Sequence, residues 1–229
     1  MKRFSKIFVL LLLLLNFSVV FAQKYYDEQW KKVADNFQKG TYKSNIPIIL
    51  DIQKQAMKEN NTLQLIQALK SEFSIINMTR DDEKNDTVSQ FFSKIQNAEK
   101  NINGDEKLLF KVLMNGFFMD YYNQNSWKIN GRTNLNSQDI SQIETWSKLD
   151  FKNYITKNFQ ELDNQKQAMG KISLTKYQDL FSNVKNISYF PTLADWYALK
   201  RWIFSQTTVF LQKMSLQKTA SRSLLFLMN

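Results

Sequence analysis

The chain has 229 residues, 43% of them apolar, which is enough to bury a core in one large domain or two small ones. It contains no Cys and no His, which excludes disulfides, thiol chemistry, His-ligated metal sites and catalytic triads built on His. Only 5 Gly and 2 Pro are present and the formal net charge is +10, so a turn-rich β fold is disfavoured and long helices are expected.

Residues 1–22 have the form of a secretory signal peptide. A short cationic segment at residues 2–6 leads into the apolar run 7–21, and the small residue Ala22 suits the position before the cleavage site. The run is shorter than the roughly 20 residues that span a bilayer. We therefore expect cleavage before Gln23, no stable membrane span afterwards, and export to the periplasm, the cell envelope or the medium.

The charge distribution does not predict a nucleic-acid interface. The net charge of the whole chain is +10, but three of its cations lie in residues 1–22 and three in residues 207–229, where no acid occurs. The net charge of residues 23–206 is therefore +4. Within that segment lysines alternate with acidic residues, whereas a nucleic-acid binder gathers Lys and Arg on one face. We expect no nucleic-acid partner.

Two helices at the start of the mature chain form an expected hairpin. Apolar residues recur at helical spacing over residues 26–37, and Gly40 follows where this first helix should stop. Ser44 or Asn45 can cap the second helix, which has Pro47 in its first turn, where a missing N–H costs nothing.

The start and stop signals of the next two helices are weaker. A third apolar stripe begins after Thr62, and the polar run 80–86 ends it. Thr87 with Gln90 three residues later has the form of a capping box and predicts the start of a fourth helix. We expect this fourth helix to end at Asn103 and Gly104.

Three more helices complete the expected set. The fifth starts with acids at 105 and 106, is apolar nearly all round and should be the most buried helix. After the polar stretch 123–139, a sixth helix covers about 146–167. Pro191 starts a seventh, whose apolar residues lie on one side.

The sequence therefore predicts an all-α domain over residues 23–206, with about seven helices in hairpins. The spacing of Trp30, Val33, Ala34 and Phe37 matches the start of a tetratricopeptide unit, but no 34-residue period returns. The arrangement is either a tetratricopeptide-like array or an irregular bundle.

Residues 207–229 form an atypical cationic tail. No Asp or Glu occurs from Trp196 to the end, and the composition changes to Ser, Thr, Leu, Lys and Gln. The tail is either a cationic amphipathic segment that contacts membrane or the product of a shifted reading frame. We expect it to be disordered.

Few patterns in the chain indicate chemistry. No phosphate loop or G-x-G-x-x-G segment occurs, and the acidic run 81–86 lacks the central Gly and the final Glu of a calcium loop. Nothing marks a pair of carboxylates for glycoside hydrolysis. We expect no catalytic residue, no metal site and no cofactor.

The densest group of aromatic and hydrogen-bonding residues lies between residues 121 and 132. Trp, Tyr and Arg dominate binding hot spots, so this 121–132 patch is the candidate site for a protein partner. Aromatic residues also fill cores, and the competing interpretation is a loop pinned over the bundle by Trp127. The members of the patch are Tyr121, Tyr122, Gln124, Asn125, Trp127 and Arg132.

Four ordered stretches resemble a known family. They are Tyr26-Asp27-x-x-Trp30; Tyr121-Tyr122-x-Gln124-Asn125-x-Trp127 with Arg132-Thr133; the segment from Asp139-Ile140 to Thr145-Trp146; and Pro191-Thr192-Leu193-x-Asp195 with Ala198. In order and spacing, over about residues 24–205, they resemble the amino-terminal helical region of the large alpha-2-macroglobulin-family proteins of Bacteroidota.

This resemblance implies an exported protein of an endopeptidase-inhibitor family. In that family macroglobulin β-domains, a bait region and, in some members, a thioester trap target proteases. The present chain ends where the β-domains would begin, and without Cys it cannot form the thioester, so no functional residue carries over. The tail 207–229 matches nothing in the family, which favours a truncated or frameshifted product.

Two functional expectations follow. The first is a non-catalytic amino-terminal helical portion of an alpha-2-macroglobulin-like protein, not inhibitory by itself. The alternative is a free-standing periplasmic helical module that binds a protein partner through a concave face or through the 121–132 patch. Exposure of Trp127 would favour the module, and its burial would make the patch structural.

Overall fold

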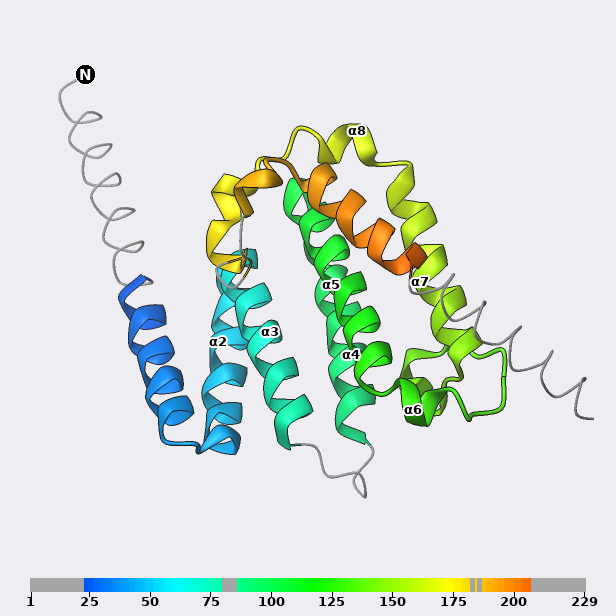
Figure 1. Ribbon diagram of the computed structural model, residues 1–229. Coiled ribbons are helices and arrows are strands. Elements are labelled where there is room, and N and C mark those ends of the chain that lie inside the picture. The colour runs from blue at the N-terminus through cyan, green and yellow to red at the C-terminus, as the bar shows by residue number, and fades with distance from the viewer. Residues whose placement is uncertain (1–22, 80–85, 182–183, 185–186, 207–229) are drawn as a thin grey trace, which may run out of the picture. The chain divides into compact units, whose positions relative to one another are not determined.

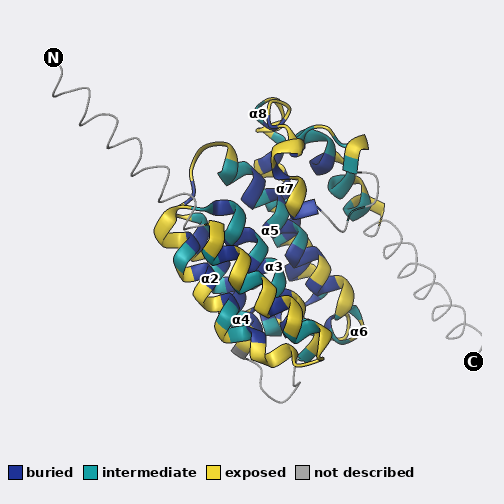
Figure 2. Ribbon diagram, turned by 90° about the vertical axis from the view of Figure 1, so that its left-hand side faces the viewer, coloured by how far each residue is buried: buried dark blue, intermediate teal, exposed yellow. Residues whose placement is uncertain are grey.

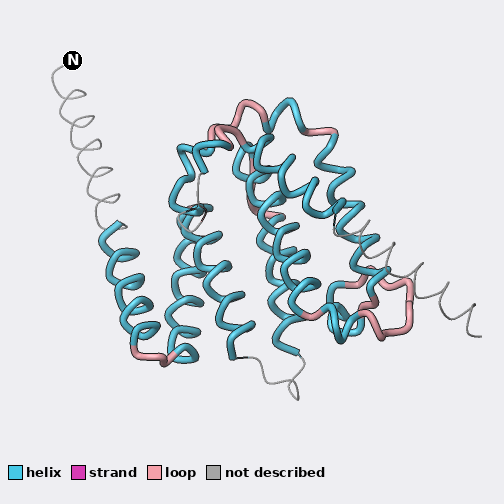
Figure 3. The backbone as a smooth tube through the Cα atoms, in the orientation of Figure 1, coloured by secondary structure: helices cyan, strands magenta, loops and turns pink. Residues whose placement is uncertain are grey.

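The structure is a computed structural model that describes residues 23–79, 86–181, 184 and 187–206. The described part is all-α, as predicted, and consists of helices joined by loops (Figures 1 and 3). Its β structure is limited to one isolated antiparallel bridge, between Ser173 and Thr192. The expected signal peptide, the connection at 80–85 and the cationic tail lie outside the described residues.

The described residues divide into two compact units within helix α4 (Asp86–Glu99). Unit 1 runs to Phe91 and unit 2 starts at Phe92. The ring of Phe91 stacks on Phe73 at a centroid distance of 5.4 Å, and the ring of Phe92 contacts Phe118 at 4.4 Å. Two adjacent residues of one helix therefore belong to two different cores.

Unit 1 contains the first three predicted helices. They are a helix over 23–38, α2 (Ile46–Glu59) and α3 (Thr62–Thr79), with a short 3-10 helix, η1 (Tyr42–Asn45), before α2. Gly40 has a φ of +71°, a left-handed conformation that favours glycine, and the first helix ends before it as predicted. Buried and exposed positions alternate along α2 in the pattern of an amphipathic helix (Figure 2).

Polar side chains join the helices of unit 1. The Tyr26 hydroxyl donates to Glu59 at 2.6 Å, and the indole N–H of Trp30 donates to Gln64 at 2.6 Å, so the first helix is tied to both α2 and α3. Between α2 and α3 the buried amide of Gln53 donates to the buried carboxylate of Glu72 at 2.6 Å. A buried carboxylate is stable only when it is hydrogen-bonded, so this pair fixes how α2 faces α3.

The expected start of α2 after Asn45, with Pro47 in its first turn, is confirmed, but one side-chain cap and two other predicted boundaries need correction. Asn45 precedes α2, but its buried side chain accepts from Asn36 and donates to the Val33 carbonyl rather than capping the helix. Thr87 lies inside α4, so the predicted capping box there is wrong. Gly104, with a φ of +62°, opens α5 instead of closing α4, which already ends at Glu99.

Unit 2 holds the longest helix and most of the short ones. Its long elements after α4 are α5 (Gly104–Gln124), α7 (Lys148–Asp163) and a helix over 193–206. Its short elements are α6 (Ser126–Ile129), η2 (Ile140–Thr145), α8 (Lys166–Met169), η3 (Leu174–Phe181) and η4 (Ile187–Tyr189). The expected single helix at 146–167 is in fact divided into α7 and α8.

Burial is spread over more than one helix. The helix expected to be most buried, α5, buries ten of its 21 residues, but α3 buries nine of its 18. The prediction that α5 would stand out is therefore wrong, because each unit has its own central helix.

Two helices of unit 2 begin with a capping box whose acid is Asp. The Ser147 side chain accepts from the Asp150 N–H at 3.3 Å, and the Asp150 carboxylate accepts from the Ser147 N–H at 2.9 Å. The same exchange joins Thr192 and Asp195 at the start of the helix over 193–206. These boxes satisfy N–H groups that a helix start leaves unpaired.

Candidate functional site

The 121–132 patch is divided between the core and the surface. Tyr121 and Tyr122, near the end of α5, are buried, and the Tyr122 hydroxyl donates to Asn130 at 3.1 Å. The side chain of Asn125 donates to the Tyr121 carbonyl at 2.8 Å, close to the end of α5. These three residues therefore serve the fold of the α5–α6 corner.

Gln124 and Trp127 remain on the surface. Trp127 is 74% exposed, and the Lys128 ammonium lies 5.0 Å from the centroid of its ring. An indole exposed to this degree does not hold a loop onto a core, so the interpretation in which Trp127 pins the loop is wrong.

Trp146 holds this region in place. It is fully buried, and its ring lies 5.2 Å from that of Phe151 and 5.1 Å from that of Tyr154. Its indole N–H donates to the Asp139 carbonyl at 3.0 Å, and its own carbonyl accepts from Arg132 at 2.9 Å. Arg132, the last member of the patch, is thus a structural residue that fixes the segment before α7.

A cavity of about 310 Å³ lies in unit 2 where α4, α5 and α7 meet, and we call it the seam cavity. Each helix contributes residues three or four apart, which place one face of each helix toward the cavity. The lining residues are Ile95, Gln96, Glu99, Lys111, Met114, Asn115, Phe118, Gln138, Tyr154, Lys157, Asn158, Glu161 and Leu162.

Polar contacts cross the seam cavity at two levels. At one level the Lys111 ammonium lies 3.3 Å from the Glu99 carboxylate and 3.6 Å from that of Glu161. At the next level the Asn158 amide donates to the Asn115 side-chain oxygen at 3.2 Å. At these two levels the seam is polar, although helix interfaces are usually apolar.

One polar group of the seam cavity is left unpaired. Asn115 is 2% exposed, and among the described residues its side-chain nitrogen has no hydrogen-bond partner. Nearby, burial raises the pKa of the Tyr154 hydroxyl, which also interacts with Asn158 and Gln96. The cavity thus combines a buried donor, a neutral phenol and charged groups at its rim.

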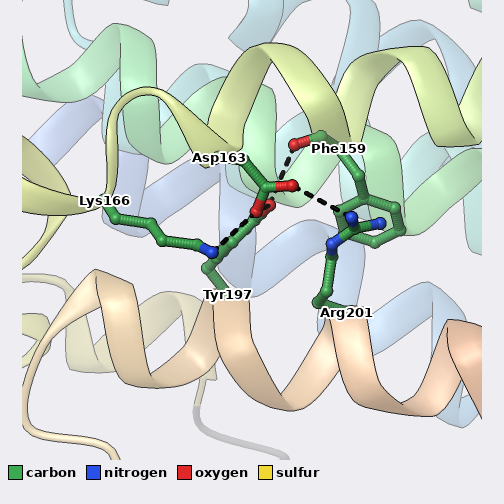
Figure 4. Close-up of polar contacts among 5 residues, drawn as sticks. All are labelled: Phe159, Asp163, Lys166, Tyr197 and Arg201. Carbon is green, nitrogen blue, oxygen red and sulfur yellow. Dashed lines mark hydrogen bonds and ion pairs between the residues drawn. The ribbon is translucent and has the colours of Figure 1, made fainter.

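A second polar cluster joins α7 to the helix over 193–206 (Figure 4). The Asp163 carboxylate accepts from the Tyr197 hydroxyl at 2.6 Å, from Arg201 at 2.9 Å and from Lys166 at 2.9 Å. Desolvation opposes ionisation of Asp163, but these three donors together lower its pKa. Desolvation and the bond to Asp163 raise the pKa of Tyr197. Because every group of this cluster has a hydrogen-bond or ion-pair partner, the cluster stabilises the packing of α7 against the helix over 193–206.

The sequence did not identify the seam residues as a group. The available signal was the presence of Lys111 and Asn115 four residues apart in a helix that is otherwise apolar nearly all round. Their partners come from α4 and α7, and no spacing within the chain indicates which helices will be neighbours.

Among the described residues there is neither a candidate membrane span nor a cluster of metal ligands. No helix in this part of the chain combines the length and the apolar character needed to cross a bilayer. In the same residues, no three acidic side chains come together in a way that could hold a metal ion.

Comparisons with known proteins do not assign the chain to a family. No protein-family model matches the chain, and neither does any curated protein or solved structure. The resemblance to the alpha-2-macroglobulin family therefore stays an expectation from the four stretches of sequence alone.

Proposed function

We propose that the chain is a non-catalytic helical region of an exported protein of the alpha-2-macroglobulin type. The observation that carries the proposal is that residues of the four stretches make contacts that pack or cap the helices. Hydrogen bonds join residues of two stretches, because Trp146 bonds to both Arg132 and Asp139. In a third stretch, Thr192 and Asp195 cap a helix. Tyr26 and Trp30 join the first helix to its neighbours. Residues that specify packing can be shared between two proteins that have no active site in common.

The absence of catalysis in this proposal rests on composition. The common nucleophile and base pairs require Cys or His, and the chain has neither. In the proposed role the helical units act as a scaffold next to the regions that trap proteases in the family.

Determination of the mature amino terminus tests the proposal in cells. The full gene is expressed with its own leader in a bacterium of the Bacteroidota, and the protein from each fraction is analysed by intact mass. The proposal predicts a chain that starts at Gln23 in the envelope, periplasmic or secreted fraction. A cytoplasmic chain that retains residues 1–22 would contradict it.

The exposure of Trp127 favours a second function, a helical module that binds a protein partner. Exposed tryptophans are enriched among binding hot spots, and Trp127 is 74% exposed. A photo-crosslinking amino acid at position 127, compared with the same group at the exposed position Lys152, tests this function in cells. One crosslinked partner specific to position 127 supports the module, and identical products at both positions exclude it.

A further inference from the structure

We propose that the seam cavity of unit 2 binds an α-amino acid group with an apolar side chain. The defining chemistry is an ammonium group separated by one carbon from a carbonyl or carboxylate. A free amino acid and the first residue of a peptide share this chemistry. The proposal does not depend on the alpha-2-macroglobulin resemblance.

The first argument comes from Asn115, which needs an acceptor. Its side-chain oxygen is occupied by the Asn158 amide at 3.2 Å, while its buried nitrogen has no partner among the described residues. An unpaired buried donor costs about 1–3 kcal/mol. A ligand that brings a carbonyl or carboxylate oxygen into the cavity removes this cost after a small shift of Asn158.

The second argument comes from the charges at the cavity. Glu99, Lys111 and Glu161 form a group with two acids and one base, so its net charge is −1 and it favours an ammonium ion. Lys157 also lines the cavity, and the described residues offer it no ion pair, so it can receive a carboxylate. Lys157 and Glu161 are four residues apart on α7, about 6 Å along the helix axis. Opposite charges at this separation suit a zwitterion better than a simple anion or cation.

The third argument comes from the apolar part of the lining. Ile95, Met114, Phe118 and Leu162 are all buried and line the same cavity. A volume of about 310 Å³ is at the lower end of the range for ligand pockets, roughly 300–1,000 Å³. This lining and this size favour a small aliphatic side chain such as that of leucine.

Calorimetric titration of the purified full chain with three related probes tests the proposal. L-leucine carries both charges, L-leucinamide lacks the carboxylate, and N-acetyl-L-leucine lacks the ammonium group. We expect saturable binding of L-leucine and a loss of affinity of about tenfold or more, equal to about 1.4 kcal/mol, for N-acetyl-L-leucine. The tripeptide Leu-Gly-Gly distinguishes the two sources: tighter binding than L-leucine indicates a peptide terminus, and weaker binding indicates a free amino acid.

Three surface variants identify the site. Lys157→Gln and Glu161→Gln change exposed residues at the cavity rim, so both proteins should fold, and each should weaken L-leucine binding by about tenfold. Lys152→Gln, at an exposed residue of α7 that does not line the cavity, should bind as the unchanged protein does. Absence of saturable heat with every probe would show that the cavity holds only water. Equal binding by all three variants would place the ligand elsewhere. Either result overturns the proposal.

Discussion

Trp127 and Trp146 lie in opposite environments within unit 2. Both belong to the stretches that carry the family resemblance, yet one is 74% exposed and the other fully buried. Trp146 contacts aromatic rings from α5 and α7 and bonds at both its indole N–H and its carbonyl. The stability of unit 2 should therefore depend on Trp146 far more than on Trp127.

Replacement of the two tryptophans measures this difference. Trp146→Ala should lower the free energy of unfolding by about 3–5 kcal/mol, because it leaves a cavity and unpaired polar groups. Trp127→Ala, the matched control, should change it by no more than about 0.5 kcal/mol. Urea denaturation followed by circular dichroism gives both values. Similar losses for the two variants would contradict the assignment of Trp146 as the residue that fixes this region.

Two buried tyrosines should make the protein sensitive to alkali. Tyr26 donates to Glu59 and Tyr197 to Asp163, and burial together with these bonds raises both pKa values. The folded chain thus keeps protons that the unfolded chain releases above about pH 10. The stability from these groups is fully present below that pH and is lost as the pH rises further.

Tyrosine to phenylalanine variants test this pH dependence. Tyr26→Phe and Tyr197→Phe should each reduce the loss of stability between about pH 8 and about pH 11, because the titrating group is gone. Tyr189→Phe is the control, since that ring is 75% exposed and has no hydrogen-bond partner among the described residues. Denaturant unfolding at each pH gives the comparison. An unchanged alkaline slope in both buried variants would refute the prediction.

At the scale of the helix, the two Asp capping boxes set where α7 and the helix over 193–206 begin. Each box leaves its acid close to the positive end of the helix dipole. Ser147→Ala and Thr192→Ala should each cost about 1 kcal/mol of stability. Ser74→Ala, at an exposed position inside α3, should be neutral or slightly stabilising because alanine is the better helix former. Thermal unfolding of the three variants compares their losses of stability. A loss at Ser74 equal to that at Ser147 and Thr192 would contradict the prediction.

Helical periodicity predicted the long helices well, because an amphipathic stripe is a local property of the sequence. The boundaries were less predictable. The sequence predicts a capping box between Thr87 and Gln90, while the boxes in the structure pair Ser147 and Thr192 with an Asp three residues later. The sequence predicts a helix end at Gly104, but in the structure this glycine, with its left-handed φ, begins α5. Both boxes are contacts between residues three apart, so Ser147 with Asp150 and Thr192 with Asp195 were readable signals that a search for Glu or Gln at the third position misses.

The candidate site was harder to predict than the helices. The 121–132 patch is continuous in sequence, but Tyr121 and Tyr122 face the core while Trp127 faces solvent. The seam cavity, in contrast, joins Glu99, Lys111 and Glu161 from three helices. A linear cluster is visible in the sequence, whereas a cluster built by tertiary packing requires the structure.

At the scale of the whole molecule, α4 carries residues of both cores. Phe91 contributes to unit 1 and Phe92 to unit 2. Phe91→Ala should therefore speed amide exchange mainly in α2 and α3, and Phe92→Ala mainly in α5 and α7. Hydrogen exchange followed by mass spectrometry resolves these peptides. A uniform increase over all helices in both variants would show that the chain opens as one cooperative unit instead.

The DNA around the gene shows whether the chain is a helical region of an alpha-2-macroglobulin-type protein. Residues 207–229 carry no acid and a composition unlike that of residues 23–206. The gene and its downstream flank are sequenced from fresh DNA and translated in all frames. We expect a single-base change near the Gln206 codon to restore a long reading frame that encodes β-rich macroglobulin domains. A confirmed stop followed by unrelated sequence would contradict it and favour the free-standing module.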